Sequence, residues 1–354
     1  MWWINSQTKT AKHRGWGSSD EGGAVLVMVA LSMVMLFGFL AIVVDFGRVY
    51  TERRELQNGA DAAALAVARD CAFGDCGTSA ERTNTAEQYA DANASDDLAW
   101  VQSVTVDLGA QTVRVETGTE DPGGDHHFDM VFAQLVGYDG LTVDADATVA
   151  WGAPKGLATL PLIFSTCEWE KFGSTTHPPE AVINGELPPT LGYPRQSEYA
   201  TVFFHGRSEP CHESPSGQDL PGGFGWLDSS GDCSADIDAG GWVSIDPGNS
   251  PTTGCSASDL SGLIGEVVLI PYFDDIVGTG AGAQYHVAGF GALYVTGYNF
   301  TGRYKENSVI PDHTKACSPP DTCIEGYFIK PWAASGGGEI GGGDFGVRII
   351  QFVD

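Results

Sequence analysis

Basic residues are scarce in this chain of 354 residues: there are 18 Lys and Arg against 46 Asp and Glu, a formal net charge of −28 at pH 7. Nucleic acids and anionic lipid headgroups are bound through clustered Lys and Arg. The composition therefore excludes a nucleic-acid-binding protein and argues against a domain that lies flat on an anionic membrane surface. The excess of carboxylates fits either cation binding or a self-repelling surface that stays soluble outside the cell, and we favour the second interpretation.

Signatures of catalysis and of zinc binding are also missing. The sequence has no Gly-x-Ser-x-Gly, His-Glu-x-x-His or Walker pattern, and it has no Cys-x-x-Cys pair. His126 and His127 precede Asp129, but adjacent histidines on a loop usually point apart, so they do not predict a metal site. We therefore expect no enzyme, no metal and no cofactor.

One acidic loop leaves calcium open as an alternative. Residues 228–238 contain four Asp residues. An EF-hand loop requires Gly at its sixth position and Glu at its twelfth, whereas this segment has Gly231 in fourth position and Ala239 in twelfth. The EF-hand is absent, and only a calcium loop of another type remains.

The cysteines are even in number and all follow residue 70, in a region rich in glycine. This pattern is typical of disulfide bonds in an oxidising compartment. We expect short loops closed by Cys71–Cys76 and Cys317–Cys323, and pairing of the other four among themselves, with Cys211–Cys233 preferred. The candidate disulfide residues are Cys71, Cys76, Cys167, Cys211, Cys233, Cys255, Cys317 and Cys323.

Residues 22–44 form an apolar run without a single charge. About 20 apolar residues cross a bilayer as a helix, so this run predicts a transmembrane helix. A cleaved signal peptide is the alternative, but its apolar region is shorter and ends in small residues at a cleavage site. Here the run ends at Asp45, Phe46, Gly47 and Arg48, which favours a retained anchor.

Lys and Arg do not decide which side of the membrane each part occupies. The flanking basic residues are equal in number before and after the span, and basic residues normally mark the cytoplasmic side. The cysteines therefore decide, and they predict a cytoplasmic N-terminus and a large extracytoplasmic part. The flanking residues are Lys9, Lys12 and Arg14 before the span and Arg48, Arg53 and Arg54 after it.

The helix should continue beyond the membrane to about residue 70, because this stretch has no proline and is rich in alanine. Leu56, Ala60, Ala63 and Val67 lie on one stripe at three- and four-residue spacing, and small residues let another element approach closely. The stripe fits a packing seam for a partner or sister subunit. It fits equally well the docking of the helix against the chain's own globular part.

Further along, the periodicity predicts an α+β chain. A second helix is expected within residues 80–97, a hairpin within 101–117, a short helix within 128–137 and a strand within 141–151. Together they predict a small ββαβ unit followed by a disulfide-containing, mainly-β domain. The expected regions are a cytoplasmic tail (1–21), a transmembrane helix (22–44), an extracytoplasmic helical region (45–99), the small α+β unit (100–153) and the mainly-β extracellular domain (154–354).

The anchor region resembles the TadE/TadG-like family of tight-adherence (Flp-type) pilus assembly proteins. The family pattern is an apolar span, an Asp-x-Gly-Arg exit and a charged helix that ends in an alanine-rich run, and the strand ending at residues 147–154 is similar to the close of the periplasmic unit in TadG-like proteins. The matching residues are Asp45, Gly47, Arg48, Leu56, Gln57, Ala60, Asp61, Ala62, Ala63, Ala64, Leu65 and Ala66.

One departure from the family places the chain on the TadG side of the resemblance. TadE-type members resemble type IV pilins, with a glutamate near the fifth position after a glycine cleavage site. Counted from Ala24 that position is Met28, and counted from Gly23 it is Val27. Neither side chain can neutralise a neighbour's N-terminal amine, so we expect an unprocessed membrane protein and not a repeating pilus subunit.

Two functions remain open. The resemblance implies a single-pass membrane protein of Flp/Tad-type pilus assembly or surface adhesion, which contacts other pilus-assembly or secretion proteins and the lipid bilayer, with self-association through the N-terminal helix as a further expectation. The alternative is a surface-tethered β domain that binds a ligand such as carbohydrate. Aromatic residues that could stack on sugars are Trp226, Trp242, Tyr272, Tyr285, Tyr294 and Tyr298, although such residues more often form the core.

Overall fold

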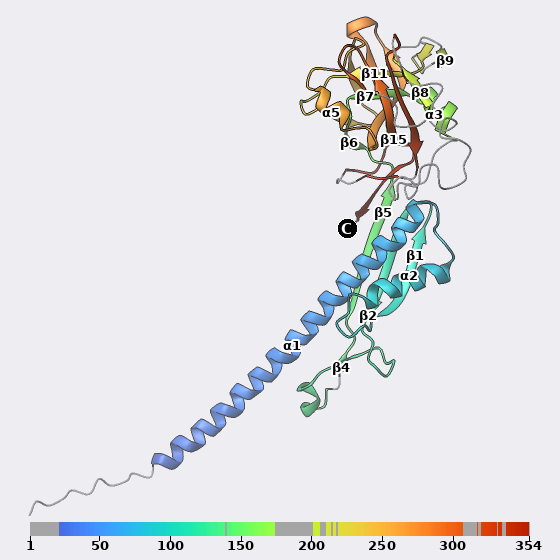
Figure 1. Cartoon of the computed structure of the whole chain (residues 1–354). Helices are drawn as coiled ribbons and strands as arrows, with labels where there is room; N and C mark the ends of the chain where they lie inside the picture. Colours follow the sequence, from blue (N-terminus) through green and yellow to red (C-terminus); the bar gives the residue numbers. More distant parts are fainter. Residues whose placement is uncertain are drawn as a thin grey trace, which may run out of the picture.

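The computed structural model describes residues 21–138, 140–173, 201–205, 210–213, 215–216, 219–306, 317, 320–330, 332–334 and 338–353. Its first element is one unbroken helix, α1 (Glu21–Ala72), of 52 residues. At about 1.5 Å per residue this helix is about 78 Å long, and Figure 1 shows it projecting from the rest of the chain. Its apolar half is long and hydrophobic enough to cross a membrane, and none of that window is buried against the chain.

The second half of α1 packs, together with α2 (Ser79–Asp91), against a five-stranded sheet. Every second residue of β2 and β5 enters the shared core, as for Val113 and Val149, while Arg114 on the other face pairs with Glu116. The expected hairpin is confirmed. The strands, in sheet order, are β1 (Trp100–Asp107), β2 (Thr112–Gly118), β5 (Asp144–Gly152), β20 (Val347–Phe352) and β18 (Trp332–Ala333).

The helix expected within residues 128–137 is wrong. This segment forms the short strand β3 (Phe128–Asp129), which pairs with β4 (Gly140–Leu141), and one 3-10 turn, η1 (Ala133–Val136), that ends at Gly137 with a φ of 84°. A helix here would cover a face of the small sheet, but α1 and α2 already cover that face. The segment instead reaches down beside α1 (Figure 1).

A nine-stranded sheet dominates the C-terminal region, in agreement with the mainly-β expectation. Two long antiparallel strands, β14 and β15, form its centre. Its main path is β13 (Trp242–Asp246), β11 (Phe224–Leu227), β7 (Leu162–Ser165), β14 (Val267–Val277), β15 (Gln284–Asn299), β17 (Cys323–Ile329) and β8 (Thr201–Phe204), and β16 (Lys305–Glu306) and β19 (Gly343–Asp344) pair with β15.

Small elements surround this sheet. Strand β6 pairs with β12, and β9 pairs with β10. Three short helices lie among the described residues of this region. The bounds are β6 (Gly156–Thr159), β12 (Ala235–Asp238), β9 (Pro210–Glu213), β10 (Asp219–Pro221), α3 (Thr166–Phe172), α5 (Ala257–Ser261) and η4 (Gly280–Gly282).

The last strand crosses the boundary expected at residues 153 and 154. Strand β20 returns from the C-terminal region and pairs antiparallel with β5, where Ile350 lies opposite Trp151. Figure 1 shows the C-terminus beside β5 as a result. The small unit is therefore not the closed ββαβ arrangement that we expected, because its sheet includes a strand from the far end of the chain.

Disulfide bonds form both at the end of α1 and in the C-terminal region. They join Cys71 to Cys76, Cys233 to Cys255 and Cys317 to Cys323, and Cys167 is also disulfide-bonded. The pairing preferred from sequence, Cys211–Cys233, is wrong because Cys233 is bonded to Cys255. The two short-loop pairings are those that the spacing suggested.

Candidate functional site

The first charged residue after the apolar span, Asp45, is bonded to a distant loop. Its carboxylate accepts hydrogen bonds from the backbone N–H groups of Val131, Phe132 and Ala133, at 3.1, 3.1 and 2.8 Å. Asp45 is buried, with an exposed fraction of only 6%. Buried backbone N–H groups require partners, so Asp45 fixes the height of this loop along α1.

Arg48 holds the same loop one helical turn further along. Its Nη1 donates a hydrogen bond to the backbone oxygen of Asp129 at 3.1 Å, and its guanidinium lies 5.0 Å from the centre of the Phe128 ring. Gly47 lies between the two anchoring residues, and a Cβ built there would meet nothing within 4 Å. Among the described residues, contacts thus account for Asp45 and Arg48 of the exit motif but not for Gly47.

The alanine stripe lies in the core of the chain itself. Leu56, Ala60, Ala63 and Val67 are all buried in the cluster that joins α1 to α2 and the five-stranded sheet. The backbone oxygen of Leu56 also accepts a hydrogen bond from the Thr117 hydroxyl at 3.1 Å. Of the two interpretations left open by the spacing, the structure therefore supports docking against the chain's own globular part.

α1 and α2 approach closely at Gly59, a residue that was not among the predicted packing residues. A Cβ at Gly59 would lie 3.2 Å from the Cα of Ala90 on α2. Glycine lowers the stability of a helix relative to alanine, and the close approach of another backbone can compensate for this cost. The isolated glycine in this run was the signal for a helix crossing.

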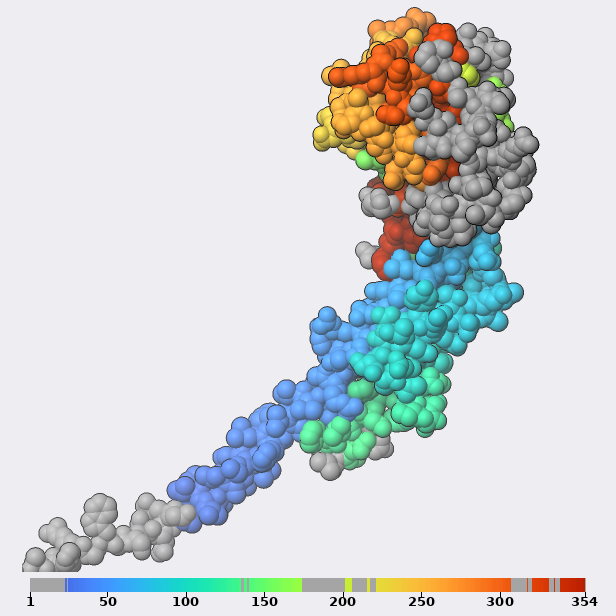
Figure 2. Space-filling view, in the orientation of Figure 1, coloured from blue at the N-terminus to red at the C-terminus, as the bar shows by residue number. Residues whose placement is uncertain are grey.

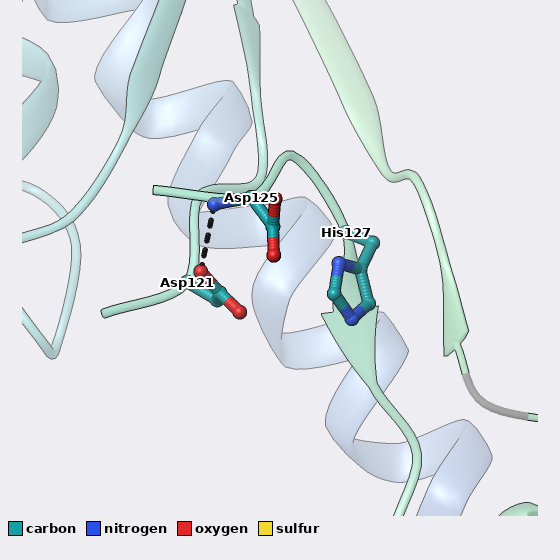
Figure 3. Close-up of side chains that lie close together, drawn as sticks. All are labelled: Asp121, Asp125 and His127. Atoms are coloured by element: carbon teal, nitrogen blue, oxygen red, sulfur yellow. Dashed lines mark hydrogen bonds between the residues drawn. The ribbon is translucent and has the colours of Figure 1, made fainter. Parts of the chain in front are cut away.

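An acidic cluster lies near the same loop, and Figure 3 shows its three side chains. Asp121, Asp125 and His127 each place a ligand atom within 4.8 Å of the others. The Asp121 carboxylate already accepts the backbone N–H groups of Gly123 and Asp125, each at 2.8 Å, and the bond from Asp125 is the main cause that lowers the pKa of Asp121. His127 lies 3.0 Å from an oxygen of Asp129. These contacts are those of a closed turn and do not by themselves make a metal centre.

The acidic loop at residues 228–238 brings no such group together among the described residues. Its second half forms β12, in which Asp236 and Asp238 are exposed and the alternating residues Ala235 and Ile237 are buried. Alternation along a strand explains this pattern. The structure offers no support for the calcium alternative at this loop.

The aromatic residues considered for sugar stacking are mostly in the core. Trp226, Tyr272 and Tyr298 are buried, and burial is the main cause that raises the pKa of Tyr298 to about 12. Tyr285 stacks on Phe273. Tyr294 likewise stacks on Tyr327, and Trp242 is the member of the set that is exposed.

The anchor region is similar to a known protein family. A family model described as Flp pilus-assembly TadE/G-like matches residues 22–70. The matched stretch lies entirely within α1 and includes both the Asp45–Arg48 exit and the buried stripe. No curated protein and no solved structure matches the chain.

Proposed function

We propose that the protein is a single-pass membrane component of a Flp/Tad-type pilus-assembly system, with a cytoplasmic N-terminus and a large extracytoplasmic part. The observation that carries the proposal is that the TadE/G-like match covers one continuous helix with an exposed apolar half and a buried half. Exposed apolar side chains over such a length are stable in lipid and not in water. The buried half packs against α2 and the five-stranded sheet, so one helix connects the proposed span directly to the globular part.

Contacts, and not catalysis, are the proposed mode of action. The motif that would assign a nucleophile or a catalytic acid and base is missing from the sequence. A rigid connection from membrane to outer domain suits a protein that presents a surface at a fixed distance from the bilayer, whereas a simple tether could be a flexible linker. The partners are proposed to be other proteins of the assembly system.

We do not propose that the protein is a repeating pilus subunit. Met28 and Val27 are apolar and exposed, so neither can compensate a buried ammonium group in a filament core, where an unpaired charge costs several kcal/mol. One face of α1 beyond the span is already buried against the chain's own sheet. We therefore propose that Gly22 and Gly23 are not cleaved.

Two measurements test the proposal in cells that make the protein. Mass spectrometry of the terminal peptide should show no cleavage after Gly22 or Gly23, and crosslinking in membranes before purification should recover pilus-assembly proteins. A mature chain that begins at Gly23 or Ala24, recovered from sheared filaments, would contradict the non-pilin role. Recovery without any pilus-assembly protein, at a crosslinker concentration that captures a known complex of that system, would contradict the assembly role.

A further inference from the structure

We propose that the segment 128–138, which the anchor helix holds at the membrane exit, is a second membrane contact that inserts Val131, Phe132 and Tyr138 into the interfacial region of the bilayer. We call this segment the exit loop. The inference rests on the proposed membrane crossing of α1, but not on a role in pilus assembly.

The height of the exit loop is set by its bonds to α1. Asp45 immediately follows the uncharged run at residues 22–44, and it binds the N–H groups at the start of η1. Arg48, one turn further from the membrane, binds the base of the loop at Asp129. The tip of the loop must therefore lie at the level where α1 enters the lipid, or below it.

The composition of the exit loop differs from that of the chain around it. Residues 130–138 contain no charge, in a chain with a net charge of −28. Val131, Phe132 and Tyr138 have exposed fractions of 52%, 38% and 56%. A contiguous exposed apolar patch on a soluble surface marks an interaction site, and a tyrosine among apolar residues is typical of a membrane interface.

The patch continues directly into the lipid-facing surface of α1. Phe132 and Ala133 line one side of an apolar cavity of about 1000 Å³, and the other side is formed by α1 itself, through Met35, residues 37–42 and Asp45. Figure 2 shows the loop, in green, lying against the blue helix in the direction of its apolar end. Because the same lipid that surrounds the span would fill this cavity, the bilayer is the occupant that the geometry favours over a separate protein.

The backbone of the exit loop is prepared for low polarity. The hydrocarbon of a bilayer cannot accept hydrogen bonds from backbone N–H groups, so a segment at its edge is favoured when these groups find partners within the protein. Asp45 serves the N–H groups of residues 131–133, and the N–H groups of Gly137 and Tyr138 bond to the oxygens of Gln134 and Ala133 at 3.0 and 3.1 Å. Pairing of β3 with β4 closes the base of the loop. In an exposed loop these N–H groups could instead bond to water.

A quenching experiment with single labelled positions tests the inference. The full chain is placed in phospholipid nanodiscs under non-reducing conditions that preserve its disulfides. Val131→Cys and Tyr138→Cys carry a fluorescent label, Ile42→Cys is the reference within the span, and Leu108→Cys at the 64% exposed tip of the β1–β2 hairpin is the matched exposed control. Nitroxide lipids and aqueous iodide are the two quenchers.

We expect labels at positions 131 and 138 to lose most of their emission to nitroxide near the headgroups and to be shielded from iodide, and the label at 108 to behave in the opposite way. Quenching of positions 131 and 138 by iodide alone would overturn the inference. Protection from both quenchers would indicate burial in protein, through a second copy or another partner, and would overturn it equally. If the label at Ile42 also escaped nitroxide lipid, the membrane crossing of α1 would fail, which separates that failure from failure of the exit loop alone.

Discussion

The two halves of α1 belong to one helix and are both rich in small and apolar residues, yet they are buried in opposite ways. The described side chains between residues 23 and 44, apart from Ala41, are exposed, whereas Ala60, Ala63 and Val67 have no exposed surface. The first half has lipid as its proposed partner, and the second half has its own sheet. Helical spacing alone therefore identifies a packing face without saying what the face packs against.

Larger side chains on the buried face of α1 should have the largest effect on stability. The double substitution Ala60→Leu and Ala63→Leu forces two larger side chains into a closed core, which should cost about 1–3 kcal/mol for each site. We expect a marked loss of thermal stability of the outer domain, measured in detergent by circular dichroism. Membrane insertion should persist, because the span is unchanged.

Ala30→Leu is the matched control, since Ala30 lies on the exposed apolar half. It should leave the melting temperature nearly unaltered. If the double variant folded as well as the control, but failed to assemble with a partner, the stripe would be an intermolecular seam and the burial seen in the structure would not describe the protein in the cell.

Particular residues show how far the sequence predicts this structure. The uncharged run, the hairpin at residues 101–117 and the mainly-β C-terminal region are local patterns, and the structure contains each of them. The helix expected at 128–137 failed because its apolar residues serve a loop held by Asp45 and Arg48. Such contacts join residues more than 80 positions apart, and no local pattern reports them. The same holds for the pairing of β20 with β5.

Removal of the Asp45 carboxylate should release the exit loop. Asp45→Ala leaves the N–H groups of residues 131–133 without their acceptor, and an unsatisfied buried group costs about 1–3 kcal/mol. We expect faster hydrogen exchange at Val131, Phe132 and Ala133, measured by mass spectrometry in nanodiscs. Asp45→Asn retains one acceptor oxygen and should fall between the wild type and the alanine variant.

Exchange that stays unchanged in Asp45→Ala would show that the loop is held by other contacts. The Arg48→Ala variant then provides an independent comparison, because Arg48 binds the base of the loop and not its tip. Protection at Leu293, which is buried in the centre of β15 in the distant nine-stranded sheet, serves as the internal standard for the wild type and the three variants.

Two glycines of α1 allow the effect of one added methyl group to be compared between an open and a packed position. Gly47→Ala places its Cβ in open space and should stabilise the helix by up to about 1 kcal/mol. Gly59→Ala gains the same helical propensity but brings its Cβ to 3.2 Å from the Cα of Ala90, so α2 must shift. We expect Gly59→Ala to be the less stable of the two in thermal unfolding, and an equal stability of both would show that the crossing is loose.

The smallest expected effect concerns Glu52, which lies on α1 between its two differently buried halves. Burial, with the nearby charges of Asp96 and Glu55, raises its pKa from 4.5 to about 7. The folded state therefore favours the protonated carboxyl, so its stabilising contribution is complete below about pH 4.5 and is lost as the pH rises through about 7. Glu52→Gln resembles the protonated form, and its melting temperature should exceed that of the wild type at pH 8 while the two converge near pH 4.5.

Glu87→Gln, at an exposed position of α2, is the control for the loss of one negative charge. A constant difference between Glu52→Gln and the wild type across this range would show that Glu52 keeps an ordinary pKa, and that the junction of the two halves is open to water.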